Sequence, residues 1–304
     1  MGQQTLPLEI HKVLLSAALL VFAGYFNWIV LAYIHDFVGR QPLPDLFTSF
    51  IAEQRWALKL GDVMVTLSSG TMILLFILHK HRAIVMRRTF FILAILYFIR
   101  GVSMFGTQLP SGYSDNDREC RPQLEKEERT FVTYLSRVLE QSVHFGLQDT
   151  SKKMLCGDML FSGHTLIMVT SSLVVEYYLP TNLRLVQYVP KLFTVFGIVC
   201  LILSRTHYTI DILFATVVSA GVFSIYHAFC EIETYRERKQ SVLYRFWIMR
   251  LVGWMEANVI PGRVENELVV PFLPKIYRKI RARIEKKKQQ QTTSSTSTMV
   301  VDIP

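Results

Sequence analysis

Long apolar runs separated by short polar segments dominate this chain. Apolar runs close to the roughly 20 residues that a helix needs to cross a bilayer lie at about 13–34, 60–78, 89–109, 160–180, 188–204 and 208–230. Within each run the apolar residues are continuous rather than alternating, which indicates helices rather than strands. The pattern therefore predicts an all-α fold, a polytopic six-helix transmembrane bundle.

The same pattern divides the chain into four parts. Residues 1–12 are a short polar N-terminus, and residues 13–230 form the six-span domain. Residues 231–288 form a basic tail, partly associated with the membrane, in which 278–288 could form a basic helix on the membrane surface or be a solvated run of charges. Residues 289–304 contain a low-complexity sequence rich in Gln, Ser and Thr, which predicts a disordered C-terminal segment.

Composition supports a membrane protein, and charge orients it. Hydrophobic residues make up 51% of the 304 positions, and the net charge is +9. The tail from 231 onward holds 14 Lys or Arg against 8 Asp or Glu, whereas the loop 106–157 holds 7 against 8. Lys and Arg are enriched in cytosolic loops, so both termini and the basic loop 79–88 are predicted to be cytosolic. Six crossings agree with this orientation.

The basic tail indicates contact with membrane lipid headgroups rather than nucleic acid. Four cysteines are too few and too scattered for a disulfide framework or a zinc site. Cys120 and Cys156 could meet in one loop, but free thiols are the expectation for all four. No carboxylate cluster is arranged for magnesium, so neither a metal nor another cofactor is predicted.

Two polar blocks interrupt the apolar pattern. The first runs from Cys156 to Thr165 and contains Asp158, Ser162 and His164; the second runs from His207 to Asp211. Ionisable residues at membrane depth are costly and usually functional. A carboxylate four residues after a histidine lies on the same helical face. With the predicted crossings, both blocks face the side of the membrane opposite to the termini.

Each of these residues has an ordinary structural explanation when it is taken alone. A lone histidine at a membrane interface is usually a half-hydrated ring, and an Asp near a helix start is usually a cap. Ser162-Gly163 could be a tight turn into a helix. Two histidine blocks on one side of a membrane are better explained jointly, as a catalytic site for phosphoryl transfer at a lipid surface.

At these residues the chain resembles the sphingomyelin synthase family. Its pattern C-G-D-x-x-x-S-G-H-T is matched by Cys156 to Thr165, and its pattern H-Y-[ST]-x-D by His207 to Asp211. Further similar blocks, in the family's order, are Pro42 to Asp45, Arg87-Arg88 with Tyr97, Arg100, Met104, Thr107 and Leu109-Pro110, and the later Glu256, Asn258 and Pro271-Phe272.

The resemblance implies a phosphatidylcholine:ceramide cholinephosphotransferase, a transferase that makes sphingomyelin and diacylglycerol. It implies six spans, cytosolic termini and a luminal or exoplasmic site, in the Golgi or plasma membrane, with the endoplasmic reticulum as an alternative. Homo-oligomerisation is left open. Thr206 stands where family members usually carry an acidic residue before the second-block histidine. A ceramide phosphoethanolamine synthase that uses phosphatidylethanolamine is therefore the alternative.

The chemistry expected of this family assigns roles within the two blocks. His207 is the expected nucleophile, Asp211 holds its imidazole in the reactive tautomer, and His164 is the general acid and then the general base. Asp158 either orients His164, positions the headgroup, or merely caps the fourth span.

Four further residues are assigned to the substrate site. Arg100, near the middle of the third span, is expected to bind the donor phosphate, with an internal pair to Glu176 as the alternative. Arg205 would steer phosphate, and Ser162 belongs to the same site. Tyr208 is expected in the interfacial aromatic belt.

Two other functions compete with this interpretation. A lipid phosphate phosphatase also combines S-G-H with a second histidine block, but its S-R-x-x-x-x-x-H spacing is not met by Ser204-Arg205 and His207. A non-enzymatic lipid scramblase or sterol-type binding protein would not require an intact His-Asp set.

Overall fold

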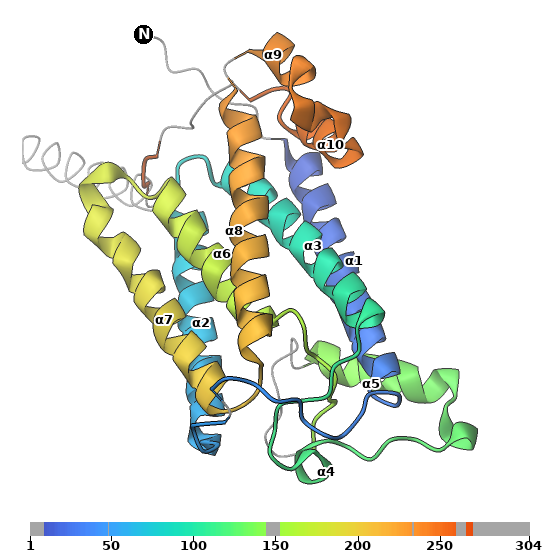
Figure 1. The fold of residues 1–304 in the computed structure, drawn as a ribbon. Helices are drawn as coiled ribbons and strands as arrows, with labels where there is room; N and C mark the ends of the chain where they lie inside the picture. The colour runs from blue at the N-terminus through green and yellow to red at the C-terminus, as the bar shows by residue number, and fades with distance from the viewer. Residues whose placement is uncertain (1–8, 48, 144–152, 233, 260–265, 270–304) are drawn as a thin grey trace, which may run out of the picture.

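The computed structural model describes residues 9–47, 49–143, 153–232, 234–259 and 266–269. Long helices run side by side through most of the molecule (Figure 1). They are α1 (Ile10–Ile34), α2 (Arg55–Leu78), α3 (Arg82–Gly106), α6 (Gly163–Tyr178), α7 (Tyr188–Leu203) and α8 (Thr209–Glu231). The shorter elements are α4 (Asn116–Glu119), η1 (Lys126–Glu128), α5 (Phe131–Val143), η2 (Thr181–Gln187), α9 (Tyr235–Gln240), η3 (Val242–Arg245) and α10 (Trp247–Met255).

All six predicted apolar segments form helices, which confirms the all-α fold. Within the described residues, five helical segments, among them Thr181–Leu203 across η2 and α7, are long and apolar enough to cross a membrane. The exception is α6, whose 16 residues rise only about 24 Å at about 1.5 Å per residue. It is shorter than the predicted 160–180 because Ser162 caps its start and Pro180 follows its last turn.

The third helix begins earlier than predicted, and buried charge explains why. Arg87 and Arg88 were expected in a basic loop, yet both lie inside α3 and are 1% exposed. Arg87 donates to Glu9 at 2.8 Å, and Arg88 donates to Glu256 at 2.6 Å. Because these carboxylates neutralise the guanidinium groups, the helix continues through two arginines that would otherwise stay in water.

This ion network holds the segment before α1 and the segment after α10 against the bundle. Glu9 precedes α1 and Glu256 follows α10, and both carboxylates converge on the first turns of α3. Burial raises the pKa of Glu256, but the neighbouring Arg88 and Arg87 outweigh it and hold that pKa at about 2. The Glu256 carboxylate is therefore ionised at neutral pH.

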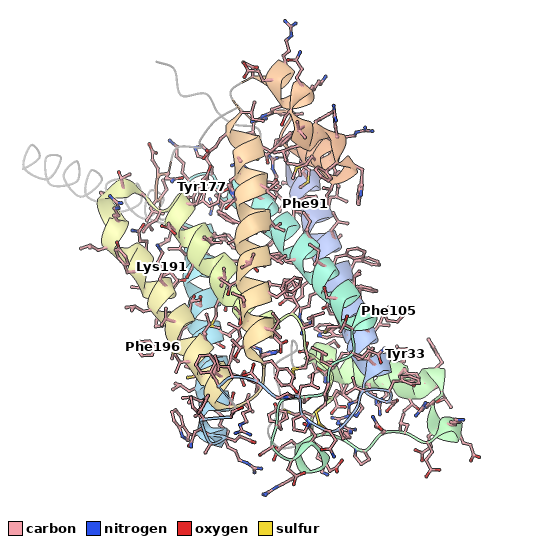
Figure 2. All side chains as sticks on the ribbon, in the orientation of Figure 1. Tyr33, Phe91, Phe105, Tyr177, Lys191 and Phe196 are labelled. Carbon is pink, nitrogen blue, oxygen red and sulfur yellow. A yellow bond between two sulfur atoms is a disulfide. The ribbon has the colours of Figure 1, made fainter. Side chains whose placement is uncertain are left out.

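The interior and exterior of the bundle are both apolar, as expected of a lipid-embedded protein. The largest core cluster fills the space between α3, α6 and α8 and includes Leu96, Leu166 and Phe229. Phe105 on α3 and Phe196 on α7 project from the outer faces and are 57% and 60% exposed (Figure 2). These outward side chains are positioned to contact lipid.

An amphipathic helix, α5, lies against the end of α1 that is remote from α10 (Figure 1). Its Phe131 is 79% exposed, whereas Arg137 is buried and donates to Asp36 at 2.9 Å. The ion pair holds α5 in place and leaves its apolar face outward. The predicted basic helix 278–288 and the predicted disordered segment 289–304 lie outside the described residues.

We expect Glu256→Ala to lower the free energy of unfolding by about 3–5 kcal/mol, because it leaves the buried guanidinium of Arg88 without its carboxylate and removes one of the two carboxylates beside Arg87. Thermal unfolding of the purified protein in detergent measures this. Glu176→Ala is the control, since Glu176 pairs with Lys191 at 2.8 Å on the exposed surface, where such a pair contributes about 0–1 kcal/mol. Equal stability of the two variants would show that the network is not a major source of stability.

Candidate active site

The two polar blocks meet at one end of the bundle, as predicted. The segment before α6 and the turn before α8 both lie at the end away from α9 and α10 (Figure 1). The ring centroids of His164 and His207 are 6.1 Å apart in an edge-on arrangement. Two imidazoles from separate helix starts are therefore close enough to act on one bound phosphate.

Asp211 links the two blocks to each other. Its carboxylate accepts the backbone N–H of Leu160 at 2.9 Å and that of Tyr208 at 2.9 Å. It is fully buried and lies 3.4 Å from Nδ1 of His207. The geometry of this contact is not that of a hydrogen bond, and Nδ1 has no hydrogen-bond partner among the described residues. Asp211 thus adjoins the imidazole as predicted, and it also caps α8.

A second carboxylate, which the sequence analysis missed, contacts the other histidine. Asp62 on α2 lies 2.9 Å from Nε2 of His164. The signal was available, since Asp62 is a carboxylate inside the apolar run of the second span, where such residues are usually functional. The site therefore contains two imidazole–carboxylate pairs, His164 with Asp62 and His207 with Asp211.

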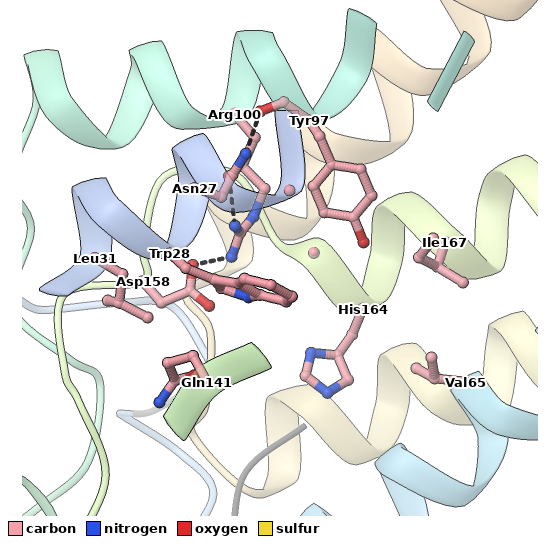
Figure 3. A pocket seen from close by; sticks show the side chains of 12 residues that line it. Asn27, Trp28, Leu31, Val65, Tyr97, Arg100, Gln141, Asp158, His164 and Ile167 are labelled. Carbon is pink, nitrogen blue, oxygen red and sulfur yellow. Dashed lines mark hydrogen bonds and ion pairs between the residues drawn. The ribbon is translucent and has the colours of Figure 1, made fainter. Parts of the chain in front are cut away.

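Arg100 is buried and points into the site. It forms an ion pair with Asp158 through Nη2 and donates to Asn27 Oδ1 at 2.7 Å (Figure 3). It also donates to the carbonyl of Phe161 at 3.0 Å. The alternative pairing with Glu176 is wrong, because that residue lies on the surface. Asp158 neither caps α6 nor contacts His164 in the described structure.

Small residues at the start of α6 allow the guanidinium of Arg100 to lie close to the helix. Ser162 caps α6 by accepting the N–H of Thr165 at 3.2 Å. A Cβ on Gly163 would lie 3.2 Å from Nε of Arg100, so glycine lets the guanidinium rest against the first turn of the helix. Gly157 has φ of +118°, a left-handed conformation that glycine adopts without a steric penalty.

A disulfide joins Cys120 to Cys156, so the expectation of free thiols is wrong for these two residues. The bridge forms because the segments fold back on each other: Arg121 N–H donates to the Met154 carbonyl at 2.9 Å, next to both cysteines. Sequence spacing alone does not reveal such a pairing. Cys200 and Cys230 are free and buried, as expected.

A buried histidine supports the same loop. Nδ1 of His35 accepts the backbone N–H of Cys156 at 2.8 Å. Burial lowers the pKa of His35 to about 4, so the ring is neutral at pH 7 and its Nδ1 lone pair is available. Stabilisation by this contact is present above the ordinary histidine pKa of about 6.5 and is lost as the pH falls toward 4.

Tyr208 and Arg205 lie away from their expected positions. Tyr208 is 3% exposed and its hydroxyl accepts the N–H of Leu43 at 2.9 Å, so the expected place in an interfacial belt is wrong. The loop that carries Asp45 covers it, since Thr209 N–H donates to that carboxylate at 3.0 Å. Arg205 donates to the Ile51 carbonyl at 2.8 Å, on the loop between α1 and α2.

A cavity of about 180 Å³ opens beside His164. Ligand sites for drug-sized molecules usually measure about 300–1,000 Å³, so this cavity suits a headgroup rather than a whole lipid. Among the described residues its wall includes His164 but not His207, which is 5% exposed. The wall is formed by Gly24, Asn27, Trp28, Leu31, Val65, Tyr97, Arg100, Gln141, Asp158, Gly163, His164 and Ile167 (Figure 3).

Known proteins are similar to this chain in sequence. Residues 155–228 match the PAP2 superfamily C-terminal family, a span that contains both histidines. A putative phosphatidylcholine:ceramide cholinephosphotransferase 3 of Caenorhabditis elegans is 46% identical over 253 residues, covering 83% of this chain and 73% of the relative. Phosphatidylcholine:ceramide cholinephosphotransferase 2 of the same organism is 37% identical over 259 residues, which are 85% of this chain and 77% of the relative.

A more distant relative is phosphatidylcholine:ceramide cholinephosphotransferase 1 of Homo sapiens, which is 28% identical over 272 residues, 88% of this chain and 64% of the relative. The all-helical membrane bundle and its match to the PAP2 superfamily fit a protein with a lipid phosphatase-like core. The sequence similarity to the relatives identifies the family within that class. The chain belongs to the phosphatidylcholine:ceramide cholinephosphotransferase family, the sphingomyelin synthases.

Replacing both Cys120 and Cys156 by serine is expected to lower the free energy of unfolding by roughly 3–4 kcal/mol, through the freedom regained by the unfolded 36-residue loop. Thermal unfolding measures the loss, and Cys200→Ala controls for removing a buried but unbridged thiol. Alkylation of the unreduced, denatured protein should modify Cys200 and Cys230 only. Modification of all four cysteines would contradict the bridge.

Proposed function

We propose that this protein transfers phosphocholine from phosphatidylcholine to the primary hydroxyl of ceramide, giving sphingomyelin and diacylglycerol. The relatives carry this activity in their names. The observation that carries the proposal is the placement of His164 and His207, with ring centroids 6.1 Å apart and a carboxylate beside each. Nucleophile and acid–base catalyst can thus reach one phosphorus from two helix starts.

In the first half-reaction, Nε2 of His207 attacks the donor phosphorus. The new P–N bond replaces the bond between phosphorus and the diacylglycerol oxygen, and His164 donates a proton to that departing oxygen. Asp211, 3.4 Å from Nδ1, stabilises the positive charge that develops on His207. Diacylglycerol then leaves.

In the second half-reaction, the primary hydroxyl of ceramide attacks the phosphorus of the phosphohistidine. The P–N bond breaks, a P–O bond forms, and His164 takes the hydroxyl proton. Asp62 holds Nε2 of His164 and leaves Nδ1 to exchange protons at the cavity. Positioned acid–base catalysis of this kind contributes about 10²–10⁴-fold to rate.

Arg100 is the phosphate-binding group of this proposal. Its guanidinium lies on the wall of the same cavity as His164, and Arg presents several N–H donors in a planar fork that matches phosphate oxygens. Asp158 holds it in place before the donor binds. Ser162, Arg205 and Tyr208 contribute indirectly, since each of them fastens a loop or helix start around the two histidines.

We also propose that the site faces the lumen or the cell exterior, in the Golgi or plasma membrane, with the endoplasmic reticulum as an alternative. A disulfide between Cys120 and Cys156 supports this, because such bonds persist in oxidising compartments. The basic start of α3 lies at the opposite end of the bundle, beside α10 (Figure 1), which agrees with a cytosolic position for that end.

Two enzymatic alternatives use other reactants. Phosphatidylethanolamine as donor would make the product ceramide phosphoethanolamine. Thr206 hydrogen-bonds Ser204 at 2.9 Å and offers no carboxylate, so it does not itself select between the two headgroups. A lipid phosphate phosphatase would transfer the phosphate of phosphatidic acid to water. Incubation with fluorescent ceramide and each zwitterionic donor, and separately with phosphatidic acid without ceramide, followed by identification of the products, separates the three.

Alanine at His164 or His207, or asparagine at Asp211, is expected to reduce sphingomyelin formation by at least 10³-fold, because each change removes a group that moves a proton, forms a bond or stabilises charge. Fluorescent ceramide and phosphatidylcholine in detergent micelles provide the assay. His11→Ala is the matched control, since that histidine lies on α1 beside Trp254, remote from the site. Full activity of any of the three variants would remove its residue from the mechanism.

Headgroup-labelled phosphatidylcholine without ceramide is expected to label the protein in an acid-labile, alkali-stable manner. Peptide mapping should place the label on His207, and addition of ceramide should release it as sphingomyelin. His164→Ala should slow labelling, whereas His207→Ala should abolish it. Label on His164 would exchange the roles of the two histidines, and absence of label with full turnover would indicate direct transfer between the lipids.

A further inference from the structure

One wall of the cavity carries two aromatic side chains that the mechanism above does not use. Trp28 on α1 and Tyr97 on α3 line the same space as Arg100, Asp158 and His164. Figure 3 shows the Trp28 indole between the Arg100–Asp158 pair and His164, and the Tyr97 ring on the side of Arg100 away from Asp158. Both residues are half-buried and line the cavity, so a ligand in that space can contact them.

The polar contacts around these rings fix their positions. The amide of Asn27, the residue before Trp28, donates to the Tyr97 carbonyl at 2.6 Å and accepts from Arg100 at 2.7 Å. The same amide donates to the Ala23 carbonyl at 2.7 Å in its own helix. One side chain therefore sets the spacing between α1 and α3 where the two aromatic residues project, and the wall is formed before any ligand binds.

The charges of the cavity match a zwitterion. Arg100 and His164 present N–H groups to a phosphate, while Asp158 adds a carboxylate to the aromatic wall. A quaternary ammonium cannot donate hydrogen bonds, and it is recognised by aromatic faces together with nearby negative charge. A primary ammonium instead needs acceptors for three N–H groups, and aromatic faces supply none of comparable strength.

We infer that Trp28 and Tyr97 form the subsite that binds the trimethylammonium group of the donor headgroup and so favours a choline lipid over an ethanolamine lipid. This inference rests on the proposed function, since it assigns the headgroup within the same site. Phosphate bound at Arg100 lies between the guanidinium and the ammonium, which removes the repulsion between the two cations. The carboxylate of Asp158 then neutralises charge on two cations, the guanidinium of Arg100 and the trimethylammonium group of the donor.

The test compares donors with identical acyl chains and choline, dimethylethanolamine or ethanolamine headgroups, using the full-length protein in lipid nanodiscs. In the wild type, kcat/KM should fall in that order. Trp28→Ala should lower kcat/KM for the choline lipid by roughly 10- to 30-fold, the range of a desolvated cation–π contact, and change the ethanolamine value less than threefold. Trp28→Phe and Tyr97→Phe keep an aromatic face and should retain most of the preference.

Trp56→Ala is the matched control, because that tryptophan lies on α2, is 59% exposed and bonds Gln54 rather than lining the cavity. If Trp28→Ala does not fold, Trp28→Leu and Tyr97→Leu carry the same comparison. Equal losses for choline and ethanolamine donors would show that the rings only support the fold. Unchanged discrimination in both aromatic-to-aliphatic variants, or a wild-type preference for ethanolamine, would also overturn the inference.

Binding measured without turnover separates this inference from the proposed function. In the His207→Ala background, a short-chain phosphatidylcholine should bind about tenfold more tightly than its ethanolamine analogue, and Trp28→Ala should remove that difference. Equal binding of the two lipids, or no binding of either, would overturn the subsite. Preferential choline binding together with wild-type protein that transfers no headgroup would uphold the subsite and overturn the transferase.

Discussion

The carboxylate of Asp211 is the interaction on which the site depends. It accepts the backbone N–H of Leu160 from one motif block and that of Tyr208 from the other, and it adjoins the imidazole of His207. A buried carboxylate is costly unless it is hydrogen-bonded, so the two loops are held together by the requirement to satisfy it. The same contacts bring His164 and His207 to one place although 43 positions of chain separate them.

Other buried charges in the protein are also paired, as a buried ionised group requires. At the end of the bundle near α10, Arg87 and Arg88 are neutralised by Glu9 and Glu256. At the other end, Arg100 is neutralised by Asp158. The first network is fully enclosed and suits a structural role, whereas the second borders a cavity where a substrate phosphate can compete for the guanidinium. Exposure to the cavity, rather than the pairing itself, distinguishes Arg100, which we propose binds phosphate, from the two arginines with a structural role.

Much of the fold and part of the site could be predicted from the sequence, because membrane helices and short motifs are encoded by residues that lie close together in the chain. Apolar run length predicted all six helices, and the spacing of His207 and Asp211 predicted their proximity. Contacts between distant segments left no such signal: the Cys120–Cys156 bridge depends on a backbone pairing at Met154, and α6 is short because of its cap and Pro180. Asp62 was visible as a carboxylate in an apolar run, but only the packing of α2 against α6 connects it with His164.

The central claim is that the headgroup passes through a histidine of the protein rather than directly between two lipids. The stereochemical course at phosphorus tests this most directly, with a donor made chiral at phosphorus by a sulfur or isotopic oxygen substitution. Two successive in-line displacements each invert the configuration, so the account predicts net retention in the phosphosphingolipid product. Net inversion would contradict it, because a single displacement by ceramide leaves no place for a phosphohistidine.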